Sequence, residues 1–481
     1  MKIKSLGINA ILNGFRSVLN IIFPLITFPY VSRVLGVQNL GIYNFTLSVT
    51  SYFMLIAMLG INSYAIREGS KYRENREQIS KFASEVFTIN LFFTIIAYIA
   101  LFICLLLASE LQKYTIIIFV FSIQIFFTTI GVDWIYSIYE EYTYITIRSI
   151  VCKLISLLLL FVFVRKSEDY ILYAAITVFA SAGSNLFNFF HAKKYCSIHI
   201  LHKFDWRKHL NPILVIFAYN IATIIYVNSD ITMLGFVKGD YSVGIYSVAV
   251  KIYNVVKNLL AAILIVCIPR LSMLFGKEMI VEYKQTLRKI FNALVLIMTP
   301  VVVGLFFVSD KVVLIIAGEE YIQAVDSLKL LSIALIFSLF AWLFSQCVLL
   351  PAKKEKTVLI ISTISAVTNV VLNFILIPIW SEKAAAFTTI IAELIMAIGC
   401  SYYAIKVVQI KGVWENVFST TVGCVAISFV CITISLLNIP LYVSLGLSVC
   451  ISAIAYISTL LFLRNQLVNE VFRKILIKIA K

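Results

Sequence analysis

Two polar stripes with the same composition and spacing lie inside apolar runs of this chain. Each combines one cation with two asparagines at positions i, i+3 and i+7, which lie on one face of a helix. The stripes consist of Asn13, Arg16 and Asn20, and of Lys251, Asn254 and Asn258, with Lys257 beside the second. Lysine and arginine supply charge and hydrogen-bond donors to an anion, and asparagine amides bond to polar ligands. Together the stripes predict a cationic cavity for a polar, anionic ligand.

The cations in these stripes are informative because apolar sequence surrounds them. An ionisable group near the centre of a bilayer costs about 2.5–3.5 kcal/mol on insertion scales, so it usually faces a protein interior or a wet cavity. The alternative is that Asn and Lys only join helices through hydrogen bonds in the membrane. Arg148 and Lys153 lie nearer the end of an apolar run, where long side chains can reach water.

Two carboxylates and two prolines are the other polar or conformationally special candidates. Asp230 ends a helical stripe of polar residues and can bind a cation or pair with an arginine. Glu393 has no charged neighbour in an apolar run, so it is protonated, paired with a base from another helix, or a proton or sodium site. Pro24 and Pro29 each remove a backbone hydrogen bond from one helix, which permits either a hinge or a static kink.

Motifs for catalysis or for metal binding are missing from the sequence. It contains neither a Gly-x-x-x-x-Gly-Lys-Ser/Thr phosphate loop nor a His-Glu-x-x-His motif. The nearest set of metal ligands is Cys196, His199 and His202, which lacks a fourth partner. The nine cysteines fall mostly in apolar runs and resemble small buried hydrophobes. We therefore expect no enzyme, no metal and no cofactor other than a possible Na⁺ or H⁺.

The composition requires a membrane to position these residues. Of 481 residues, 61% are hydrophobic and 13% are charged, and the mean hydropathy is +0.98. This is more apolar surface than a soluble domain can bury, so the chain is predicted to be an all-α polytopic membrane protein. The formal charge of +16 comes from Lys and Arg scattered over short loops, which argues for membrane topology and against nucleic-acid binding.

Division of the chain into runs of about 20 apolar residues predicts about fourteen transmembrane helices. The expected spans are 6–32, 40–66, 83–108, 113–139, 143–164, 170–192, 210–236, 241–268, 287–308, 328–350, 357–379, 384–407, 416–437 and 441–463. With a cytoplasmic N-terminus, 27 Lys and Arg lie in cytoplasmic segments against 8 outside. This asymmetry predicts that both termini are cytoplasmic.

A repeated tripeptide indicates two copies of one membrane unit. Gly41-Ile42-Tyr43 recurs as Gly244-Ile245-Tyr246, 203 positions later, and Arg67 and Arg270 close the two spans at the same offset. Six spans separate the copies, so both have the same orientation and form parallel lobes around a central cavity. The expected divisions are an N-terminal six-helix lobe at 1–192, a cytoplasmic linker at 193–209, a C-terminal six-helix lobe at 210–407, and two additional helices with a cytoplasmic tail at 408–481.

Four blocks in the first 250 residues carry a family resemblance. They are Val31-Ser32-Arg33-Val34-Leu35-Gly36 continuing to Gly41-Ile42-Tyr43; Gly60-Ile61-Asn62-Ser63-Tyr64 continuing to Arg67-Glu68; Asp133-Trp134-Ile135-Tyr136 with Tyr144-Ile145-Thr146-Ile147-Arg148; and Asp230-Ile231-Thr232-Met233-Leu234-Gly235 with Gly244-Ile245-Tyr246. In combination they resemble polysaccharide repeat-unit flippases of the Wzx type. These belong to the multidrug/oligosaccharidyl-lipid/polysaccharide exporter superfamily.

The resemblance implies a flippase of the bacterial cytoplasmic (inner) membrane that works by alternating access. Its implied substrate is an oligosaccharide on undecaprenyl pyrophosphate, used for O antigen or capsule. Membrane lipid surrounds it, and a polysaccharide polymerase and chain-length machinery are candidate protein partners. The stripes, not the motifs, then assign residues to roles: Arg16, Lys251 and Lys257 to the pyrophosphate, Asn13, Asn20, Asn254 and Asn258 to the sugars, Asp230 and Glu393 to ion coupling, and Pro24 and Pro29 to a gating hinge.

Two other functions remain as alternatives. An exporter of peptidoglycan lipid precursor or of drugs would share the superfamily, although drug exporters typically have twelve helices. An oligosaccharide polymerase, a membrane enzyme, usually has a long external loop with catalytic arginines, and the loops predicted here are short.

Overall fold

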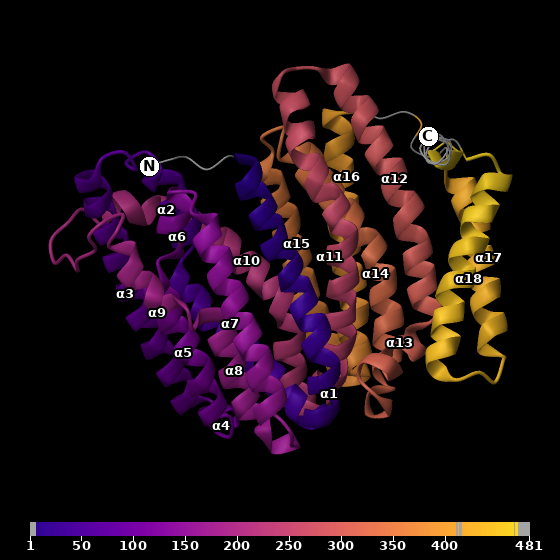
Figure 1. Cartoon of the computed structure of the whole chain (residues 1–481), viewed down its shortest axis with the longest axis horizontal. Helices are drawn as coiled ribbons and strands as arrows, with labels where there is room; N and C mark the ends of the chain where they lie inside the picture. Colours follow the sequence, from indigo (N-terminus) through magenta and orange to yellow (C-terminus); the bar gives the residue numbers. More distant parts are fainter. Residues whose placement is uncertain (1–5, 410–411, 413–415, 466, 470–481) are drawn as a thin grey trace. The chain divides into compact units, whose positions relative to one another are not determined.

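A computed structural model describes residues 6–409, 412, 416–465 and 467–469, with side chains from residue 22 onward except at 219, 222 and 223. These residues form helices, turns and loops, and no strand occurs among them. The chain divides into two compact units, residues 1–244 and 245–481. Figure 1 shows the path of the chain through both units.

The first unit contains ten helices and the start of an eleventh. They are α1 (Leu6–Met58), α2 (Ile61–Gly69), α3 (Arg76–Leu107), α4 (Ser109–Gln112), α5 (Thr115–Gly131), α6 (Asp133–Ile138), α7 (Tyr142–Phe163), α8 (Tyr170–Ala182), α9 (Asn185–Ala192), α10 (Arg207–Lys238) and the first turn of α11 (Asp240–Gly276). α1 packs against α3, α5, α7 and α10, so it forms the centre of this unit.

The second unit contains the rest of α11 and the remaining helices. They are α12 (Ile280–Phe307), α13 (Ser309–Ile316), α14 (Ala324–Phe344), α15 (Glu355–Trp380), α16 (Glu382–Val407), α17 (Val417–Ser435) and α18 (Leu441–Phe462). α14 and α15 both pack on α16. α17 and α18 pair with each other and contact α12, as the yellow hairpin in Figure 1 shows.

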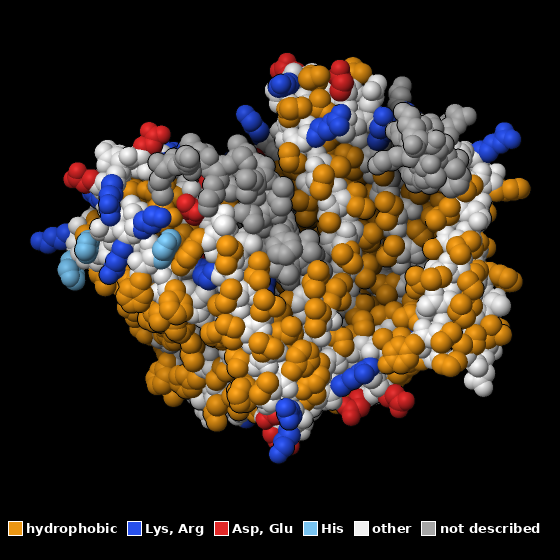
Figure 2. Space-filling view, in the orientation of Figure 1, with side chains coloured by type: hydrophobic (Ala, Val, Ile, Leu, Met, Phe, Trp, Pro, Cys, Tyr) orange, Lys and Arg blue, Asp and Glu red, His pale blue; other side chains and the backbone are white. Residues whose placement is uncertain are grey.

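Length and composition identify the longer of these helical segments as membrane-spanning. Among the described residues, eleven helical segments are long and apolar enough to cross a bilayer, and the shorter apolar α5 adds to them. Large hydrophobic side chains are exposed along the helices, for example Phe374 (74%) and Phe462 (86%). On the face seen in Figure 2, hydrophobic side chains cover the middle of the helices in each unit and charged ones gather at their ends. This pattern is typical of helices surrounded by lipid. The count of fourteen transmembrane helices stays a prediction.

The repeat seen in the sequence extends to backbone conformation. Gly36 (φ 70°, ψ 174°) and Gly239 (φ 82°, ψ −175°) are 203 positions apart and adopt the same backbone conformation. Its positive φ favours glycine. Each lies just before the segment that carries the repeated tripeptide. α1 is therefore broken at Gly36, between the first two predicted spans.

The glycines of the repeated tripeptide bring two helices into close contact. A Cβ atom on Gly41 would overlap the carbonyl oxygen of Asp240, and one on Gly244 would overlap the carbonyl oxygen of Val37. The contact is reciprocal, because each glycine faces the carbonyl four residues before the other. In the first unit, α1 and the first turn of α11 can approach this closely only because both positions lack a side chain.

Candidate functional site

The second polar stripe lies on α11, and one of its neighbours forms an ion pair with α16. Lys257 Nζ lies 2.9 Å from Glu393 Oε1. The Glu393 side chain is 7% exposed and that of Lys257 is 29% exposed. The sequence left three possibilities for Glu393: protonation, a pair with a base from another helix, or a proton or sodium site. The structure shows the pair with a base from another helix. Two residues assigned separately, one to the pyrophosphate and one to ion coupling, therefore lie together.

Tyr253 completes this cluster from one turn earlier on α11. Its hydroxyl donates to Glu393 Oε1 at 3.2 Å and lies 3.4 Å from Lys257 Nζ. The Lys257 ammonium also lies 5.4 Å from the centroid of the Tyr253 ring, within range of a cation–π contact. A half-buried cation held by a carboxylate can exchange that partner for another anion or lose it when the carboxylate is neutralised.

The other members of the second stripe lie on the open side of α11. Asn254 and Asn258 are exposed, and Lys251 is partly buried. The residues between them, Ile252 and Tyr253, are buried. The helix therefore presents both stripe amides away from its packed face, as ligand-contacting groups require. Their assignment to sugars, and that of Lys251 to pyrophosphate, stays a prediction.

The first stripe lies on α1, whose backbone begins at Leu6. The side chains of Asn13, Arg16 and Asn20 lie outside the described residues. Their shared face on a helix is consistent with the helical backbone there. Their contacts with ligand remain a prediction.

Asp230 is buried on α10, beside a polar seam that joins α10 to α1. Asn228 donates to the Ser51 hydroxyl at 3.0 Å, and the Ser48 and Thr232 hydroxyls lie 2.5 Å apart. Such contacts are the hydrogen bonds that join membrane helices. The structure therefore places Asp230 and Glu393 in different units, and ion coupling stays a prediction for both.

α1 continues through both prolines assigned to a hinge. Pro24 and Pro29 lie inside the helical run, and the non-helical backbone angles occur at Gly36. A proline removes one hydrogen bond from a helix without ending it when the neighbouring turns hold. The hinge role of the prolines is a prediction, and Gly36 is the observed break.

A buried carboxylate at the start of α11 was missed by the sequence reasoning. Asp240 is 7% exposed and accepts from the Tyr114 hydroxyl at 2.6 Å and from the Gln38 amide at 3.4 Å. Lys113 Nζ lies 3.9 Å from it. The available signal was an acid at the start of an apolar span next to Gly239, where a helix N-terminus favours negative charge.

A second missed cluster joins α2, α3 and α10. His209 is 2% exposed, with Nδ1 2.8 Å from the Tyr64 hydroxyl and Nε2 2.9 Å from Glu85 Oε2. The sequence reasoning placed His209 at the end of a cytoplasmic linker. The structure makes it a buried link at the first turn of α10. Only its rarity, as one of four histidines, could have singled it out.

Arg148 corrects an expectation, because its side chain is mostly buried and pairs with an acid of another helix. It is 12% exposed, and its Nη2 lies 3.2 Å from Asp133 Oδ1. Asn188 donates to the same oxygen at 2.6 Å. The reason is that α6 and α9 present a carboxylate and an amide to α7, and a buried cation is stable only when paired.

The three weak metal ligands do not gather into a site. Cys196 is buried, whereas His199 is exposed. Burial raises the pKa of the Cys196 thiol to about 12, which disfavours the thiolate that a metal needs. No group of three or more His, Cys, Asp or Glu with metal-binding geometry occurs among the described residues.

The comparisons with known families and relatives agree with the family resemblance of the four residue blocks in the first 250 residues. The family model described as "Polysaccharide biosynthesis protein" matches residues 6–275, and the model described as "MatE" matches residues 215–375. A candidate O-antigen transporter of Escherichia coli (strain K12) is 27% identical over 53% of this chain and 61% of its own length, which is less than two thirds of that relative.

Two other relatives align over most of their length. A candidate O-antigen transporter of Shigella dysenteriae is 22% identical over 79% of this chain and 95% of its own. The "Capsular polysaccharide biosynthesis protein CapF" of Staphylococcus aureus is 24% identical over 76% of this chain and 91% of its own.

Solved structures show the fold. The chain resembles "Lipid II flippase MurJ, inward closed conformation" with a TM-score of 0.73 at 16% identity, over 96% of this chain and 99% of that one. It resembles an inward-facing multidrug resistance MATE family transporter with a TM-score of 0.60 at 12% identity, over 83% and 98%. The chain therefore belongs to the polysaccharide biosynthesis protein family, as a Wzx-type member of the multidrug/oligosaccharidyl-lipid/polysaccharide exporter superfamily.

Proposed function

We propose that this protein is a flippase that moves lipid-linked oligosaccharide repeat units across the bacterial inner membrane for surface polysaccharide synthesis. The family match over residues 6–275 is the observation that carries the proposal. Relatives named as O-antigen transporters and as a capsular polysaccharide biosynthesis protein support it, and so does a fold shared with flippases and exporters. The protein acts as a transporter and not as an enzyme.

The substrate is an oligosaccharide on undecaprenyl pyrophosphate. A pyrophosphate cannot cross hydrocarbon unaccompanied, so cations must replace its water. Arg16 and Lys251 supply charge and donors to the phosphates, with Lys257 as a third cation. The asparagines of the two stripes bond to sugar hydroxyls. The lipid tail stays in the bilayer while the head group passes through a wet cavity, and the cavity opens alternately to each side.

The Lys257–Glu393 pair couples this movement to a cation. When Glu393 is charged, it holds Lys257 at 2.9 Å. A proton or Na⁺ on the carboxylate cancels that attraction and releases the ammonium for a phosphate. Because a ligand shifts an equilibrium only through its different affinity for the two states, this exchange links ion binding to substrate binding. Asp230 is the second candidate for the coupling ion.

Complementation of a flippase-null strain tests the proposal. The wild-type chain should restore surface glycan and remove the lipid-linked units that accumulate facing the cytoplasm. Arg16→Ala and Lys251→Ala should each lower surface glycan at least tenfold, while Lys277→Ala, on an exposed position, should leave it unchanged. Protein abundance is measured by immunoblot in every strain.

Each outcome of that experiment separates one function from another. Normal glycan in the Arg16→Ala and Lys251→Ala double variant, at normal abundance, would exclude the cavity assignment. Single repeat units on the surface of a strain that lacks only this protein would indicate a polymerase, because the units then cross the membrane without being joined. Rescue of a peptidoglycan-precursor flippase mutant in place of the glycan defect would indicate that other substrate.

A further inference from the structure

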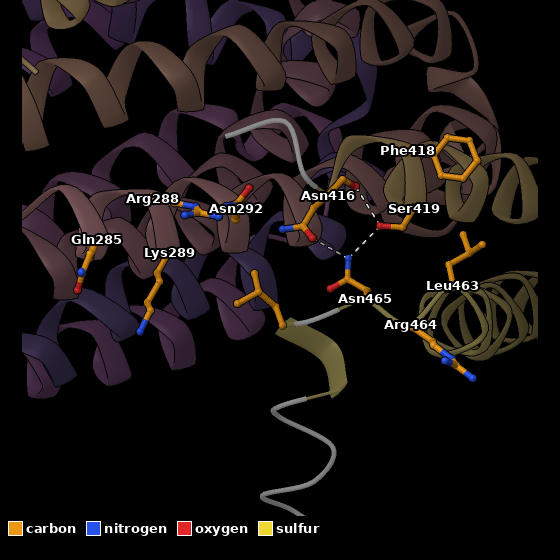
Figure 3. A pocket seen from close by; sticks show the side chains of 11 residues that line it. Gln285, Arg288, Lys289, Asn292, Asn416, Phe418, Ser419, Leu463, Arg464 and Asn465 are labelled. Atoms are coloured by element: carbon orange, nitrogen blue, oxygen red, sulfur yellow. Dashed lines mark hydrogen bonds between the residues drawn. The ribbon is translucent and has the colours of Figure 1, made fainter. Parts of the chain in front are cut away.

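A polar pocket in the second unit lies outside the site described above. It has a volume of about 630 Å³ and lies between the first turns of α12, the start of α17 and the end of α18. Arg288, Lys289 and Arg464 supply three cations to its wall, and none of its described lining residues is acidic. Figure 3 shows Arg288 and Lys289 on one side of the pocket and Arg464 on the other, with its guanidinium directed away from them. The pocket is therefore electrostatically suited to an anion.

Buried amides build the floor of this pocket. Asn465 Nδ2 donates to Asn416 Oδ1 at 2.8 Å and to the Ser419 hydroxyl at 2.9 Å, as the dashed lines in Figure 3 mark. Asn465 and Asn416 are 5% and 7% exposed. These hydrogen bonds join the start of α17 to the end of α18. They hold the floor of the pocket in place beside Arg288 and Lys289 of α12.

Two further groups at the pocket can bind a polar ligand. The first is Asn292, which lines the pocket and is 5% exposed. Its Nδ2 donates to the Gly412 carbonyl at 3.3 Å, but its Oδ1 accepts no hydrogen bond from the described residues. α17 starts in the pocket wall without a side-chain cap. The first N–H groups of a helix have no partners within it and favour a phosphate.

An apolar pocket lies further along the same helices. It has a volume of about 510 Å³ and is lined by α11, α12, α17 and α18, including Leu296, Pro300 and Tyr456. Leu296 follows Arg288 by eight residues, which is about 12 Å along a helix. A cationic pocket at the helix ends with an apolar pocket at greater depth matches the order of head group and acyl chain in a phospholipid.

We propose that this pocket binds the phosphate head group of an anionic membrane phospholipid. Arg288 and Lys289 contact the phosphate, Arg464 adds positive charge on the other side of the pocket, and Asn292 Oδ1 accepts from a hydroxyl such as that of a glycerol head group. Positive charge in the loops predicts that this end of the helices is cytoplasmic, where basic pockets between helices bind anionic lipids. The bound lipid joins the α17–α18 hairpin to α12.

Lipid binding by the full chain in nanodiscs tests the proposal. Protein in phosphatidylcholine is titrated with phosphatidylglycerol, and bound lipid is counted by native mass spectrometry. The double variant Arg288→Gln, Lys289→Gln should bind phosphatidylglycerol at least about tenfold more weakly, because it removes two of the three cations that line the pocket. The control Arg207→Gln, Lys208→Gln removes the same two residue types from exposed positions and should bind as wild type.

Three outcomes would overturn the proposal. In the first, the double variant of α12 retains wild-type affinity for phosphatidylglycerol. In the second, inorganic phosphate displaces the lipid at equal concentration, which would make the site one for free phosphate. In the third, wild-type protein binds undecaprenyl pyrophosphate through Arg288 but no phosphatidylglycerol, which would make the pocket part of the substrate path. Equal melting temperatures of all variants in phosphatidylcholine exclude misfolding as the cause of a loss.

Discussion

At the scale of single residues, the proposed function depends on a few polar side chains in apolar surroundings. Lys257, Glu393 and Tyr253 form one cluster although α11 and α16 are far apart in sequence. A buried ion pair contributes little net stability, because desolvation offsets the attraction, but losing one partner leaves a costly charge. We therefore propose that the pair serves exchange of partners and not stabilisation.

Glu393→Gln and Lys257→Gln should each abolish or strongly reduce complementation, while the double variant is more stable than either single one. Each single change leaves an unpaired polar group. The expected loss in unfolding free energy is on the order of 2 kcal/mol, less than for a fully buried pair because Lys257 is partly exposed. Thermal unfolding in detergent measures it. Additive losses in the double variant would mean that the two residues do not interact.

Cys196 should resist a water-soluble maleimide at pH 8 in a background with no other cysteine. Burial raises its pKa to about 12, so the thiolate fraction at pH 8 is about 10⁻⁴. The neighbouring position is exposed, so Ser197→Cys in place of Cys196 should label readily. Labelling followed by gel shift measures both. Fast labelling of folded Cys196 would contradict its buried position.

At the scale of elements, the repeated glycines determine how closely two helices approach. Gly41 and Gly244 each face a backbone carbonyl of the other helix, and Gly36 and Gly239 share one unusual backbone conformation. A repeated tripeptide alone could reflect common ancestry without a structural requirement. The reciprocal contact gives the repetition a steric reason.

Gly41→Ala should destabilise the protein by about 1–3 kcal/mol, the usual cost of overpacking, because its Cβ would overlap the Asp240 carbonyl. Gly304→Ala is the matched control. Nothing lies within 4 Å of its added Cβ, so this change inside α12 should be neutral or stabilising by about 0.5–1 kcal/mol. Thermal unfolding of both variants, together with complementation, measures the difference. Equal stability of the two would argue against close packing at Gly41.

At the scale of the whole molecule, hydrocarbon thickness and loop charge predict how the chain crosses the membrane. Eleven described helical segments are sufficient in length and hydropathy for a crossing. The outward-facing apolar residues and the charged helix ends are consistent with that arrangement in each unit. The orientation rests on the distribution of Lys and Arg.

The orientation predicts opposite labelling at two exposed positions in a cysteine-free background. Glu110→Cys should react with an impermeant maleimide in spheroplasts, because the loop after the third predicted span lies outside. Ser197→Cys should react only after permeabilisation, because the segment after the sixth span is cytoplasmic. Reaction of both positions without permeabilisation would contradict the predicted topology.

The sequence by itself determined the helical membrane architecture, the repeat and the family, because these depend on local hydropathy, charge in loops and short motifs. Only the tertiary structure decided which polar groups meet. It paired Lys257 with Glu393 over 136 positions and Tyr114 with Asp240 over 126, and it buried Arg148 against Asp133. The reason is that spacing along a helix defines a face, whereas the partner opposite that face depends on how distant helices pack.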